Sequence, residues 1–359
     1  MPDNAALWQR SAGGRPEVSV APYTPPRAHE VVVRVRAVAV NPIDVMPGLA
    51  RRILLPWLKY PTVLGSDVAG EVVEVGAQVT RLRPGDRVLG HAVGIAKDRN
   101  RAADGAFQIY TVLVEHMVST IPDTLPFERA AVIPLALSTA ASGLFQQDQL
   151  ALDLPQGGRP DIPQTVLVWG GSTSVGMNGI QLARNAGYRV VATASPKNFD
   201  YLRSLGAEEI VDYHAKDVVD RLVKAVGPAA LVGILAIGAG SVKYGLQLAT
   251  RTSGKTRIAA AQPSFLVRMQ QRKALRAGVH LSAIWGGSLR NNEVGPAVYV
   301  DFLPKALIDG RYTAAPLPIV VGDGLEQIGA GMQRLKKGVS AGKVVITLNV
   351  DRESSRSVG

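Results

Sequence analysis

Residues 166–186 read VLVWGGSTSVGMNGIQLARNA, and this stretch decides the fold. It begins with the apolar run Val166–Trp169, which is typical of a parallel strand covered on both faces. The glycine-containing loop Gly170–Gly176 follows. The residues that come next predict a helix that buries one stripe of small and apolar side chains: Val175, Gly179, Leu182, Ala183 and Ala186. Strand, loop and helix in this order are typical of a dinucleotide-binding unit.

Segments of these two kinds alternate through the middle of the chain. The predicted strands are residues 166–169, 189–194, 209–212, 230–237, 258–261 and 279–285. Because helical stretches separate most of them, we predict an α/β domain with a doubly wound parallel sheet. Residues 145–165 contain prolines and glycines and are predicted to be a long surface connection.

The first third of the chain has β character instead. In Val31–Val40, apolar residues alternate with Arg34 and Arg36, as in a strand with one exposed face. Short strands are also predicted at 65–76 and 86–90, and many short strands with glycine and proline turns indicate a small barrel or sandwich. Residues 343–348 return to β character and are expected to rejoin this first domain.

Length and composition narrow the class of protein. The 359 residues suffice for two domains, and 47% apolar with 19% charged residues is typical of a globular chain. The absence of cysteine excludes disulfides, thiol nucleophiles and cysteine-containing zinc sites. We see no membrane span of ~20 apolar residues and no secretory signal, so a cytoplasmic protein without membrane contact is expected.

The formal charge of +11 favours anionic partners. Short groups of basic residues are interpreted as solvated surface: Arg51 and Arg52; Lys97, Arg99 and Arg101; Arg268, Arg272, Lys273 and Arg276; Lys336 and Lys337. No aromatic residues interleave with these groups, so nucleic acid is not an expected partner.

The loop Gly170–Gly176 has the composition of a diphosphate-binding turn. Glycines permit a sharp turn close to a ligand, and the start of the next helix offers free N–H groups. A glycine-rich turn can also be a plain connection, but the position in the βα series favours dinucleotide binding. The expected cofactor contacts are Gly171, Ser172, Thr173, Ser174 and Val175.

The end of the next strand indicates which dinucleotide is bound. An NAD site usually has Asp or Glu there to hold the ribose 2′-hydroxyl. This chain has Ser195-Pro196-Lys197-Asn198 instead. A hydroxyl, a cation and an amide suit a 2′-phosphate, so we expect NADPH on Ser195, Lys197 and Asn198. The alternative is that Asn198 caps the next helix while Lys197 is solvated, and both interpretations can hold together.

Together these segments resemble the medium-chain dehydrogenase/reductase superfamily over nearly the whole chain. The resemblance is carried by Asn41-Pro42-Ile43-Asp44, Gly65-Ser66-Asp67-Val68-Ala69-Gly70, Gly85-Asp86-Arg87-Val88, Gly105-Ala106-Phe107-Gln108, Gly170–Gly176 and Gly342-Lys343-Val344-Val345. The sequence is similar to the zinc-independent, quinone-oxidoreductase-like branch and, within it, to stand-alone trans-acting enoyl reductases.

The resemblance implies a two-domain fold with the ligand in the cleft between the domains. A GroES-like, β-rich substrate domain is expected at 1–135 and 310–359, and a Rossmann NADPH-binding domain at 136–309. It also implies that no metal is bound, because Ser66 and Asp67 occupy the His-Glu positions of zinc-dependent relatives. Without zinc, conjugate reduction of an enone, enoyl thioester or quinone is the expected chemistry.

Several site residues follow from the resemblance alone. The expected catalytic residues are Asn41, Asp44, His91 and Thr139, with Phe107 and His91 on the substrate side. Further expected cofactor contacts are Ser138 and Thr139 near the nicotinamide and Tyr213 beside the adenosine phosphate. Asn41 and Asp44 have an alternative of equal weight, which is that they only build a turn. Met46 stands where relatives often have Tyr or Lys, and methionine cannot donate a proton.

Functions of different classes remain open at this point. The first is an NADPH-dependent reductase of activated C=C bonds or quinones. The alternatives are a non-redox binding or auxiliary protein, or a cyclase, that keeps the cofactor fold. The charge of +11 and Met46 allow these alternatives, with an acidic acyl-carrier protein as a candidate partner. Both a monomer and a homodimer are compatible with the sequence.

Overall fold

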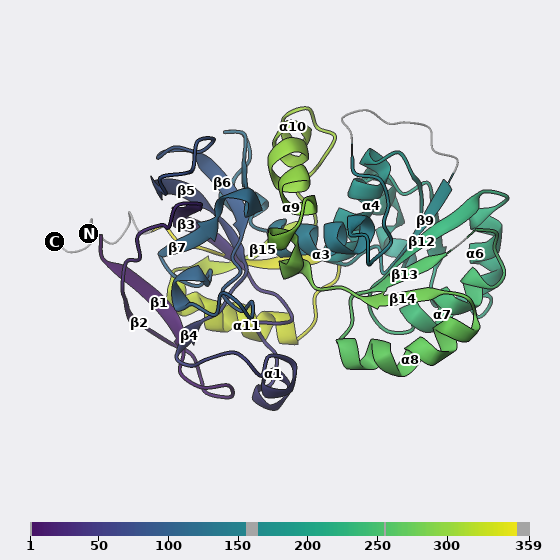
Figure 1. Cartoon of the computed structure of the whole chain (residues 1–359), viewed down its shortest axis with the longest axis horizontal. Coiled ribbons are helices and arrows are strands. Elements are labelled where there is room, and N and C mark those ends of the chain that lie inside the picture. Colours follow the sequence, from purple (N-terminus) through teal and green to yellow (C-terminus); the bar gives the residue numbers. More distant parts are fainter. Residues whose placement is uncertain (1, 156–163, 255, 350–359) are drawn as a thin grey trace. The chain divides into compact units, whose positions relative to one another are not determined.

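The chain forms two compact units in a computed structural model that describes residues 2–155, 164–254 and 256–349 (Figure 1). Unit 1 comprises Met1–Leu135 and Leu317–Gly359, and unit 2 comprises Ala136–Pro316. The second boundary lies at Pro316 instead of the expected 309. The residues before it stay with unit 2 because the carbonyl groups of Arg311, Thr313 and Ala315 accept hydrogen bonds from a helix of that unit.

A parallel sheet forms the centre of unit 2. Its strands are β9 (Gln164–Trp169), β10 (Arg189–Ala194), β11 (Glu209–Asp212), β12 (Ala230–Ala236), β13 (Arg257–Ala260) and β14 (His280–Ala283). They lie in the order β11-β10-β9-β12-β13-β14, and every neighbouring pair is parallel. This is the strand order of a dinucleotide-binding fold, so the predicted doubly wound α/β class is confirmed.

Helices precede, connect and follow these strands. They are α3 (Pro134–Phe145), α4 (Ser174–Asn185), α5 (Phe199–Ser204), α6 (Val218–Val226), α7 (Ser241–Ala249), α8 (Ser264–Arg276), α9 (Val294–Pro296) and α10 (Leu303–Ile308), with the short turns η3 (Pro196–Asn198) and η4 (Gly286–Asn291) and the π-helical η5 (Ala297–Phe302). Among the described residues, no helix of either unit is long and apolar enough to cross a membrane.

The stripe predicted for α4 is largely correct. Gly179, Leu182 and Ala183 are buried as expected, whereas Val175 is only half-buried. The helix is buried on further sides as well, because Asn178 and Gln181 donate hydrogen bonds to the carbonyl oxygens of Ala315 and Thr313. A single apolar stripe therefore understates how deeply α4 is enclosed.

The segment 145–165 differs from its prediction as a surface connection. Phe145 belongs to α3, and β9 already begins at Gln164. Between them, Leu150 and Leu152 are buried, and Leu150 packs so closely on β12 that a Cβ on Gly233 would lie 2.8 Å from its Cδ1. Leu150 and Leu152 thus fill the core. Residues 156–163 of this prediction lie outside the described residues.

Unit 1 is built from strands and short helices. Its strands are β1 (Asn4–Gln9), β2 (Glu17–Ala21), β3 (Glu30–Ala39), β4 (Thr62–Val63), β5 (Asp67–Val75), β6 (Arg87–His91), β7 (Tyr110–Val114), β8 (Val118–Thr120), β15 (Leu317–Asp323) and β16 (Gly342–Thr347). Its helices are α1 (Gly48–Leu54), α2 (Phe127–Ala130) and α11 (Ile328–Lys336), with η1 (Ala102–Asp104), η2 (Glu115–Met117) and η6 (Leu325–Gln327). The β character predicted for the first third of the chain is confirmed.

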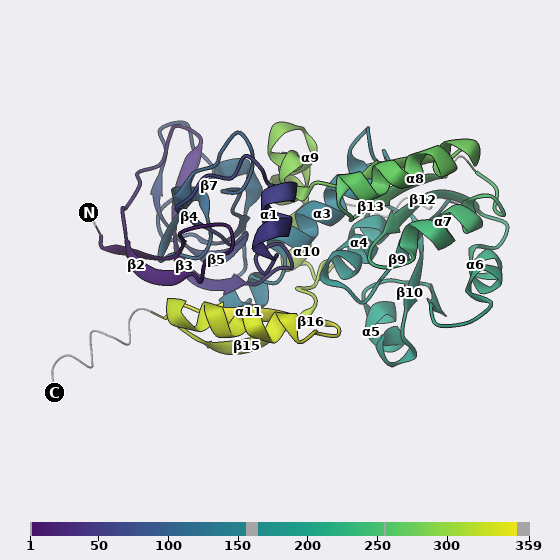
Figure 2. The same ribbon diagram turned by 90° about the horizontal axis from the view of Figure 1, so that it is seen from below.

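Two sheets organise unit 1, and the carboxyl-terminal part of the chain belongs to the larger one. The smaller sheet has the order β2-β1-β4, and the larger has the order β15-β16-β3-β5-β6-β8 with β7 paired to β3. β16 runs antiparallel to β3, with Val345 opposite Ala39. Figure 2 shows this late segment, in yellow, beside the early purple strands. Unit 1 is therefore assembled from both ends of the sequence.

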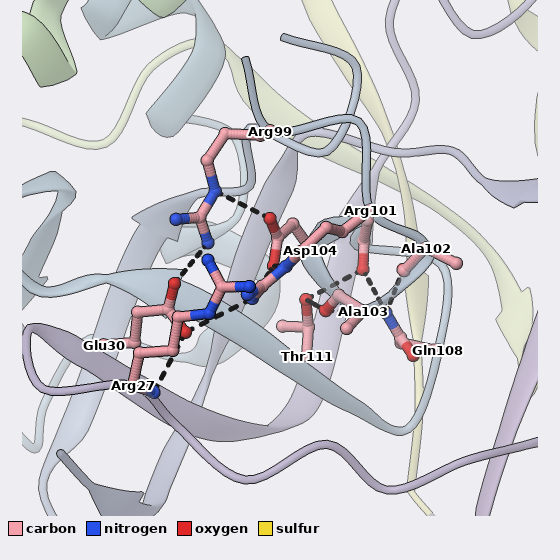
Figure 3. Close-up of polar contacts among 10 residues, drawn as sticks. Arg27, Glu30, Arg99, Arg101, Ala102, Ala103, Asp104, Gln108 and Thr111 are labelled. Carbon is pink, nitrogen blue, oxygen red and sulfur yellow. Dashed lines mark hydrogen bonds and ion pairs between the residues drawn. The ribbon is translucent and has the colours of Figure 1, made fainter. Parts of the chain in front are cut away.

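A buried ion-pair network holds the segment 99–104 against the start of β3 (Figure 3). The Arg99 guanidinium lies 2.6 Å from Glu30 and 2.8 Å from Asp104, and the Arg101 guanidinium lies 3.2 Å and 2.6 Å from the same carboxylates. The Asp104 side chain is fully buried, and that of Glu30 is 4% exposed. Arg99 and Arg101 are therefore not solvated surface residues, because each is paired with two buried carboxylates.

We expect Glu30→Gln to lower the free energy of unfolding by roughly 3 kcal/mol at pH 7, since it leaves two guanidinium groups without one of their counter-charges. Burial alone raises the pKa of Glu30, but the Arg27 N–H and the guanidinium groups of Arg99 and Arg101 lower it overall. A lowered pKa means that the stabilisation is present above the unfolded-state pKa and disappears as the pH falls through the folded-state pKa. The loss should therefore shrink in acid, as measured by urea titration with tryptophan fluorescence.

The matched control for this experiment is Glu17→Gln. The Glu17 carboxylate lies 2.7 Å from the Arg10 guanidinium, but both side chains are more than half exposed. Exposed pairs contribute about 0–1 kcal/mol, so this variant should be nearly as stable as the parent. If the two variants lost equal free energy of unfolding, burial of the network around Glu30 would contribute nothing to stability.

Candidate functional site

Unit 1 holds the expected catalytic residues Asn41 and Asp44 in a tight turn after β3. The Asp44 N–H donates to the Asn41 carbonyl oxygen at 3.0 Å, and Asp44 Oδ2 accepts from the Asn41 N–H at 2.8 Å. Asp44 Oδ1 accepts from the Gly65 N–H at 3.3 Å. Both side chains are buried. The turn-building role is thus confirmed by geometry, and any role in catalysis is additional to it.

Asn41 also belongs to a second set of contacts, which we call the buried lysine cluster: Asn41, Asp67 and Lys343. The Asn41 side-chain amide donates to Asp67 Oδ2 at 2.8 Å, and its Oδ1 accepts from the Lys343 ammonium. Lys343 Nζ lies 2.9 Å from Asp67 Oδ2, and Asp67 Oδ1 accepts from the Leu135 N–H at 2.6 Å. The lysine side chain is 5% exposed and the aspartate is fully buried, so the pair is neutralised inside the unit.

Asp44 lies beside this cluster, and its carboxyl group is perturbed. Burial raises the pKa of Asp44 from the usual 3.8 to about 7, and the charge of Asp67 adds to the rise. The N–H groups of Asn41 and Gly65 and the ammonium of Lys343 act in the opposite direction. A carboxyl group that titrates near neutral pH can take up and release a proton under physiological conditions.

The other residues expected on the substrate side of unit 1 are His91 and Phe107. His91 ends β6, is buried, and faces Asp67 of β5 in the strand register. Phe107 is fully buried, and a Cβ on Gly65 would lie 2.5 Å from its ring. Phe107 therefore belongs to the core of unit 1, whereas Met46 is half-buried.

Arg51 is buried, which corrects its interpretation as solvated surface. Its Nη1 donates to the Ala12 carbonyl oxygen at 2.9 Å, and its Nη2 donates to the Asp44 carbonyl oxygen at 3.0 Å. The residue is 4% exposed. It thus ties the loop after β1 to the turn that carries Asp44, and its neighbour Arg52 remains exposed.

In unit 2 the loop Gly170–Gly176 joins β9 to α4 and has the tight geometry that its glycines predict. Gly170 has a φ of 81°, and a Cβ on Gly176 would lie 2.3 Å from the Gly170 carbonyl oxygen. The Gly170 N–H donates to Thr193 Oγ1 at 3.0 Å, and the Gly171 N–H donates to the Thr193 carbonyl oxygen at 2.8 Å. Glycine is required at positions 170 and 176, because any side chain would clash or strain the turn.

The same loop leaves donors free at the start of α4. Thr173 is the N-cap, and its Oγ1 accepts from the Gly176 N–H at 2.9 Å. The N–H groups of Ser172, Ser174 and Val175 have no acceptor in the part of the chain that the structure describes. Free N–H groups and the positive end of a helix dipole form an anion site. The loop therefore fits the diphosphate of a dinucleotide.

The residues predicted to hold a 2′-phosphate follow β10 and β11. Ser195 Oγ donates to the Tyr213 hydroxyl at 3.3 Å, so the structure brings these two predicted residues together. Lys197 is exposed on η3. Asn198 is the N-cap of α5, but its side chain makes no capping hydrogen bond. The ring of His214, a residue that the sequence did not single out for this site, lies 4.1 Å from that of Tyr213.

Ser138 and Thr139, expected near the nicotinamide, lie on α3. Ser138 is fully buried, and its hydroxyl shares a hydrogen bond of 2.8 Å with the hydroxyl of Tyr299 on η5. Thr139 is half-buried, and a Cβ on Gly286 would lie 2.8 Å from its Oγ1. Thr139 is therefore the more accessible of the two, and Ser138 is held by Tyr299.

The side chains around the expected metal-ligand positions bear on the question of a zinc ion. The described residues contain no group of three or more His, Cys, Asp or Glu side chains that could hold a metal. Asp67, which stands in the expected metal-ligand motif, is instead bound to Lys343 and Asn41. An ammonium group next to this carboxylate opposes a divalent cation there.

Comparison with known proteins agrees with this architecture. The alcohol dehydrogenase GroES-like domain matches residues 27–123, and the zinc-binding dehydrogenase family matches residues 174–302. The chain is 47% identical over 370 residues to the dehydrogenase pigH of Monascus ruber, which covers 97% of this chain and 100% of that protein. The chain belongs to the medium-chain dehydrogenase/reductase family.

Further relatives of this dehydrogenase/reductase carry more specific names. It is 37% identical over 351 residues to the trans-enoyl reductase himH of Aspergillus japonicus, with 96% of this chain and 98% of that protein covered. The crystal structure of the CurK enoyl reductase matches with a TM-score of 0.73 at 22% identity, covering 96% of this chain and 99% of that one, which shows the fold alone. The protein is thus an oxidoreductase of this family, whose fold implies a nicotinamide dinucleotide cofactor.

Sequence reasoning missed several residues that build the site. Lys343 was noted only as part of a family motif, yet a lysine in the run of valines that forms β16 could have suggested a buried charge. Thr193 and Tyr299 gave no signal, because a threonine in a strand and a tyrosine in a helix are ordinary. Their hydrogen bonds to Gly170 and Ser138, which the sequence did single out, become evident only in the folded chain.

We expect Asp44→Asn to become more stable relative to the parent as the pH rises from 5 to 8. The folded-state pKa of about 7 lies above the unfolded value of 3.8, so the stabilisation by the protonated carboxyl group is lost as the pH rises through the folded-state pKa. Asparagine cannot ionise, and the difference in unfolding free energy should therefore change by roughly 1–3 kcal/mol over this range. Urea titrations at several pH values measure it.

Asp86→Asn is the matched control. Asp86 Oδ2 accepts from the Arg83 N–H at 2.9 Å, and the Asp86 N–H donates to the Arg83 carbonyl oxygen at 3.1 Å, which repeats the Asn41–Asp44 turn at the surface. This variant makes the same replacement in the same kind of turn at a less buried site, and its pH series is the reference for that of Asp44→Asn. A pH-independent difference for Asp44→Asn would contradict the assigned titration.

Proposed function

We propose that this protein is an NADPH-dependent reductase of activated C=C bonds, in an enoyl thioester or enone, or of quinones, and that it works without zinc. The observation that carries the proposal is the group of polar side chains after β10 and β11. There the Ser195 and Tyr213 hydroxyls meet at 3.3 Å beside the exposed Lys197, and the segment from Ser195 to Asn198 contains no carboxylate. A doubly charged 2′-phosphate suits such a site better than a ribose hydroxyl does.

The residues of unit 2 divide the binding of the cofactor between them. The free N–H groups of Ser172, Ser174 and Val175 bind the diphosphate, and Ser195, Lys197, Asn198 and Tyr213 bind the 2′-phosphate. Thr139, with Ser138 behind it, faces the nicotinamide in this proposal. When bound, the reduced nicotinamide supplies a hydride. Gly171 keeps the loop close to the sheet, since a Cβ there would lie 3.0 Å from Leu202 and 3.2 Å from Ala192.

On the substrate side, the chain must supply hydrogen-bond donors and a proton without a metal. Asn41, Asp44, His91 and Thr139 are the proposed catalytic residues. The cluster with Lys343 fixes the Asn41 side chain, and Asp44 holds a carboxyl group whose pKa of about 7 is suited to proton exchange. Met46 can neither donate a hydrogen bond nor supply a proton. The names of the relatives, trans-enoyl reductase among them, support reduction of a conjugated acceptor.

The proposal extends to partners and location. A small enone, enoyl thioester or quinone is the proposed substrate, free or held on an acidic acyl-carrier protein, and the protein acts as a monomer or homodimer in the cytoplasm. The charge of +11 supports an anionic partner.

We expect Lys197→Glu to raise the dissociation constant for NADPH about 10- to 100-fold, because a charge-assisted hydrogen bond to phosphate is lost and a repulsive charge replaces it. Binding of NADH should change little, so the preference between the two cofactors narrows or reverses. Quenching of tryptophan fluorescence gives both constants. Lys224→Glu, an equally exposed lysine at the end of α6, should leave both unchanged. Unaltered NADPH affinity in Lys197→Glu would remove the assignment.

Turnover tests the reaction directly. We expect oxidation of NADPH, followed at 340 nm, with at least one member of a panel of enones, quinones and enoyl thioesters. Dialysis against EDTA should leave the rate unchanged, because Asp67 is bound to Lys343 and cysteine is absent. Loss of activity on chelation, with recovery on adding zinc, would contradict a metal-free mechanism. Binding of NADPH without turnover of any acceptor would favour the non-redox alternative.

A further inference from the structure

Helix α8 is the least covered long helix of unit 2. It spans 13 residues, and only Val267 and Ala274 on it are buried. It packs on β14 at the edge of the sheet, and Figure 2 shows it on the surface of its unit. Several large apolar side chains on α8 are exposed, which is uncommon for a helix that faces only water. Met269 is 77% exposed, Leu275 80% and Phe265 50%. An exposed apolar surface of this kind often marks a site that binds another molecule.

The outward face of α8 combines these apolar residues with arginines. Residues in a helix advance by about 100°, so the direction opposite Val267 and Ala274 is shared by Phe265, Met269, Arg272 and Arg276. Arg268 and Leu275 flank this stripe on one side, and Leu266 and Lys273 flank it on the other. We call the residues of the central stripe the α8 face.

The cations on α8 have no counter-charges. The helix contains no acidic residue, and none of Arg268, Arg272, Lys273 and Arg276 forms an ion pair with the described residues. Several other arginines of this unit are paired, for example Arg221 with Asp217 at 2.8 Å and Arg251 with Asp220 at 2.7 Å. These four cations are therefore available to an acidic partner from outside the described chain.

We propose that the α8 face docks an acidic, amphipathic helix of a partner protein. Arg, Met and aromatic residues are the types enriched at protein interfaces, and arginine binds carboxylates with two parallel hydrogen bonds. Arg272 and Arg276 lie one turn apart, about 6 Å along the axis, which matches acidic residues spaced i, i+4 on a facing helix. A helix of about 20 Å also suits a small, transient interface.

The arrangement favours a protein over a membrane surface. A helix that lies in a bilayer separates its apolar face from its charged face. On α8, Arg272 and Arg276 lie in the same stripe as Phe265 and Met269, so the apolar side chains cannot be buried in lipid without the arginines. The identity of this partner rests on the proposed function: it is an acidic acyl-carrier protein that presents an enoyl thioester.

Binding can be measured without turnover. The probe is a fluorescein-labelled acidic acyl-carrier protein in its phosphopantetheine-bearing form, followed by anisotropy with the full-length protein. We expect the double variant Arg272→Glu/Arg276→Glu to weaken binding about 10-fold or more, and Met269→Gln to weaken it to a lesser degree. Affinity of the parent should fall with added salt, because exposed charges are screened.

Lys336→Glu/Lys337→Glu is the matched control, since it changes the net charge equally at exposed lysines near the end of α11. It should bind the probe like the parent. Equal weakening by both double variants would overturn the proposal, because it would show a response to net charge alone. Binding of phosphatidylserine vesicles that depends on Arg272 and Arg276, without binding of the carrier, would also overturn it. So would a change from dimer to monomer in the Arg272→Glu/Arg276→Glu variant.

Kinetics separate this proposal from the proposed function. Crotonyl-carrier and crotonyl-pantetheine present the same acyl group with and without the protein. Arg272→Glu/Arg276→Glu should raise the KM for crotonyl-carrier about 10-fold or more and leave the KM for crotonyl-pantetheine unchanged. An equal rise for both substrates would overturn the docking role. Reduction of neither substrate by the parent would contradict an enoyl thioester as the substrate, while the anisotropy result would still decide the role of α8.

Discussion

The charge of Lys343 constrains the whole of unit 1. An ammonium group that is 5% exposed is tolerated only beside a counter-charge and hydrogen-bond acceptors, and here Asp67 and Asn41 provide them. These contacts join β16, the start of β5 and the turn after β3, which are as much as 302 residues apart in the sequence. The same residues place Asp44, whose carboxyl group titrates near neutral pH, at the edge of this cluster.

Unit 2 differs, because in the proposed function its loop Gly170–Gly176 keeps backbone donors free for the cofactor. The glycines at 170 and 176 allow the backbone to turn within contact distance of itself, and Thr193 and Thr173 satisfy the donors that the ligand does not need. The N–H groups of Ser172, Ser174 and Val175 are left for an anion. Unit 1 thus uses buried charge to fix its side chains, whereas unit 2 uses the backbone.

The sequence predicts the larger features well because they depend on patterns. Apolar runs and helical spacing identify the strands of unit 2, and the glycine composition of residues 170–176 predicts the tight turn between β9 and α4. The pairing of charges is harder to predict. Arg51, Arg99 and Arg101 look like surface residues in the sequence, but each binds a carbonyl group or carboxylate brought from a distant segment. Lys343 and Asp67 are likewise paired only by the folded sheet. Local composition cannot show which charge is buried with which partner.

The division of unit 1 between the two ends of the chain has a consequence for synthesis on the ribosome. Residues 136–316 form a unit of their own and can fold as soon as they leave the exit tunnel. The strands made before them can pair with each other but stay incomplete, because residues 37–39 of β3 lack their partner β16 and Asp67 lacks its cation until residue 343 has emerged. The segment made first is therefore completed last, and during that interval the end of β3 is an unpaired strand edge of the kind with which another chain can pair.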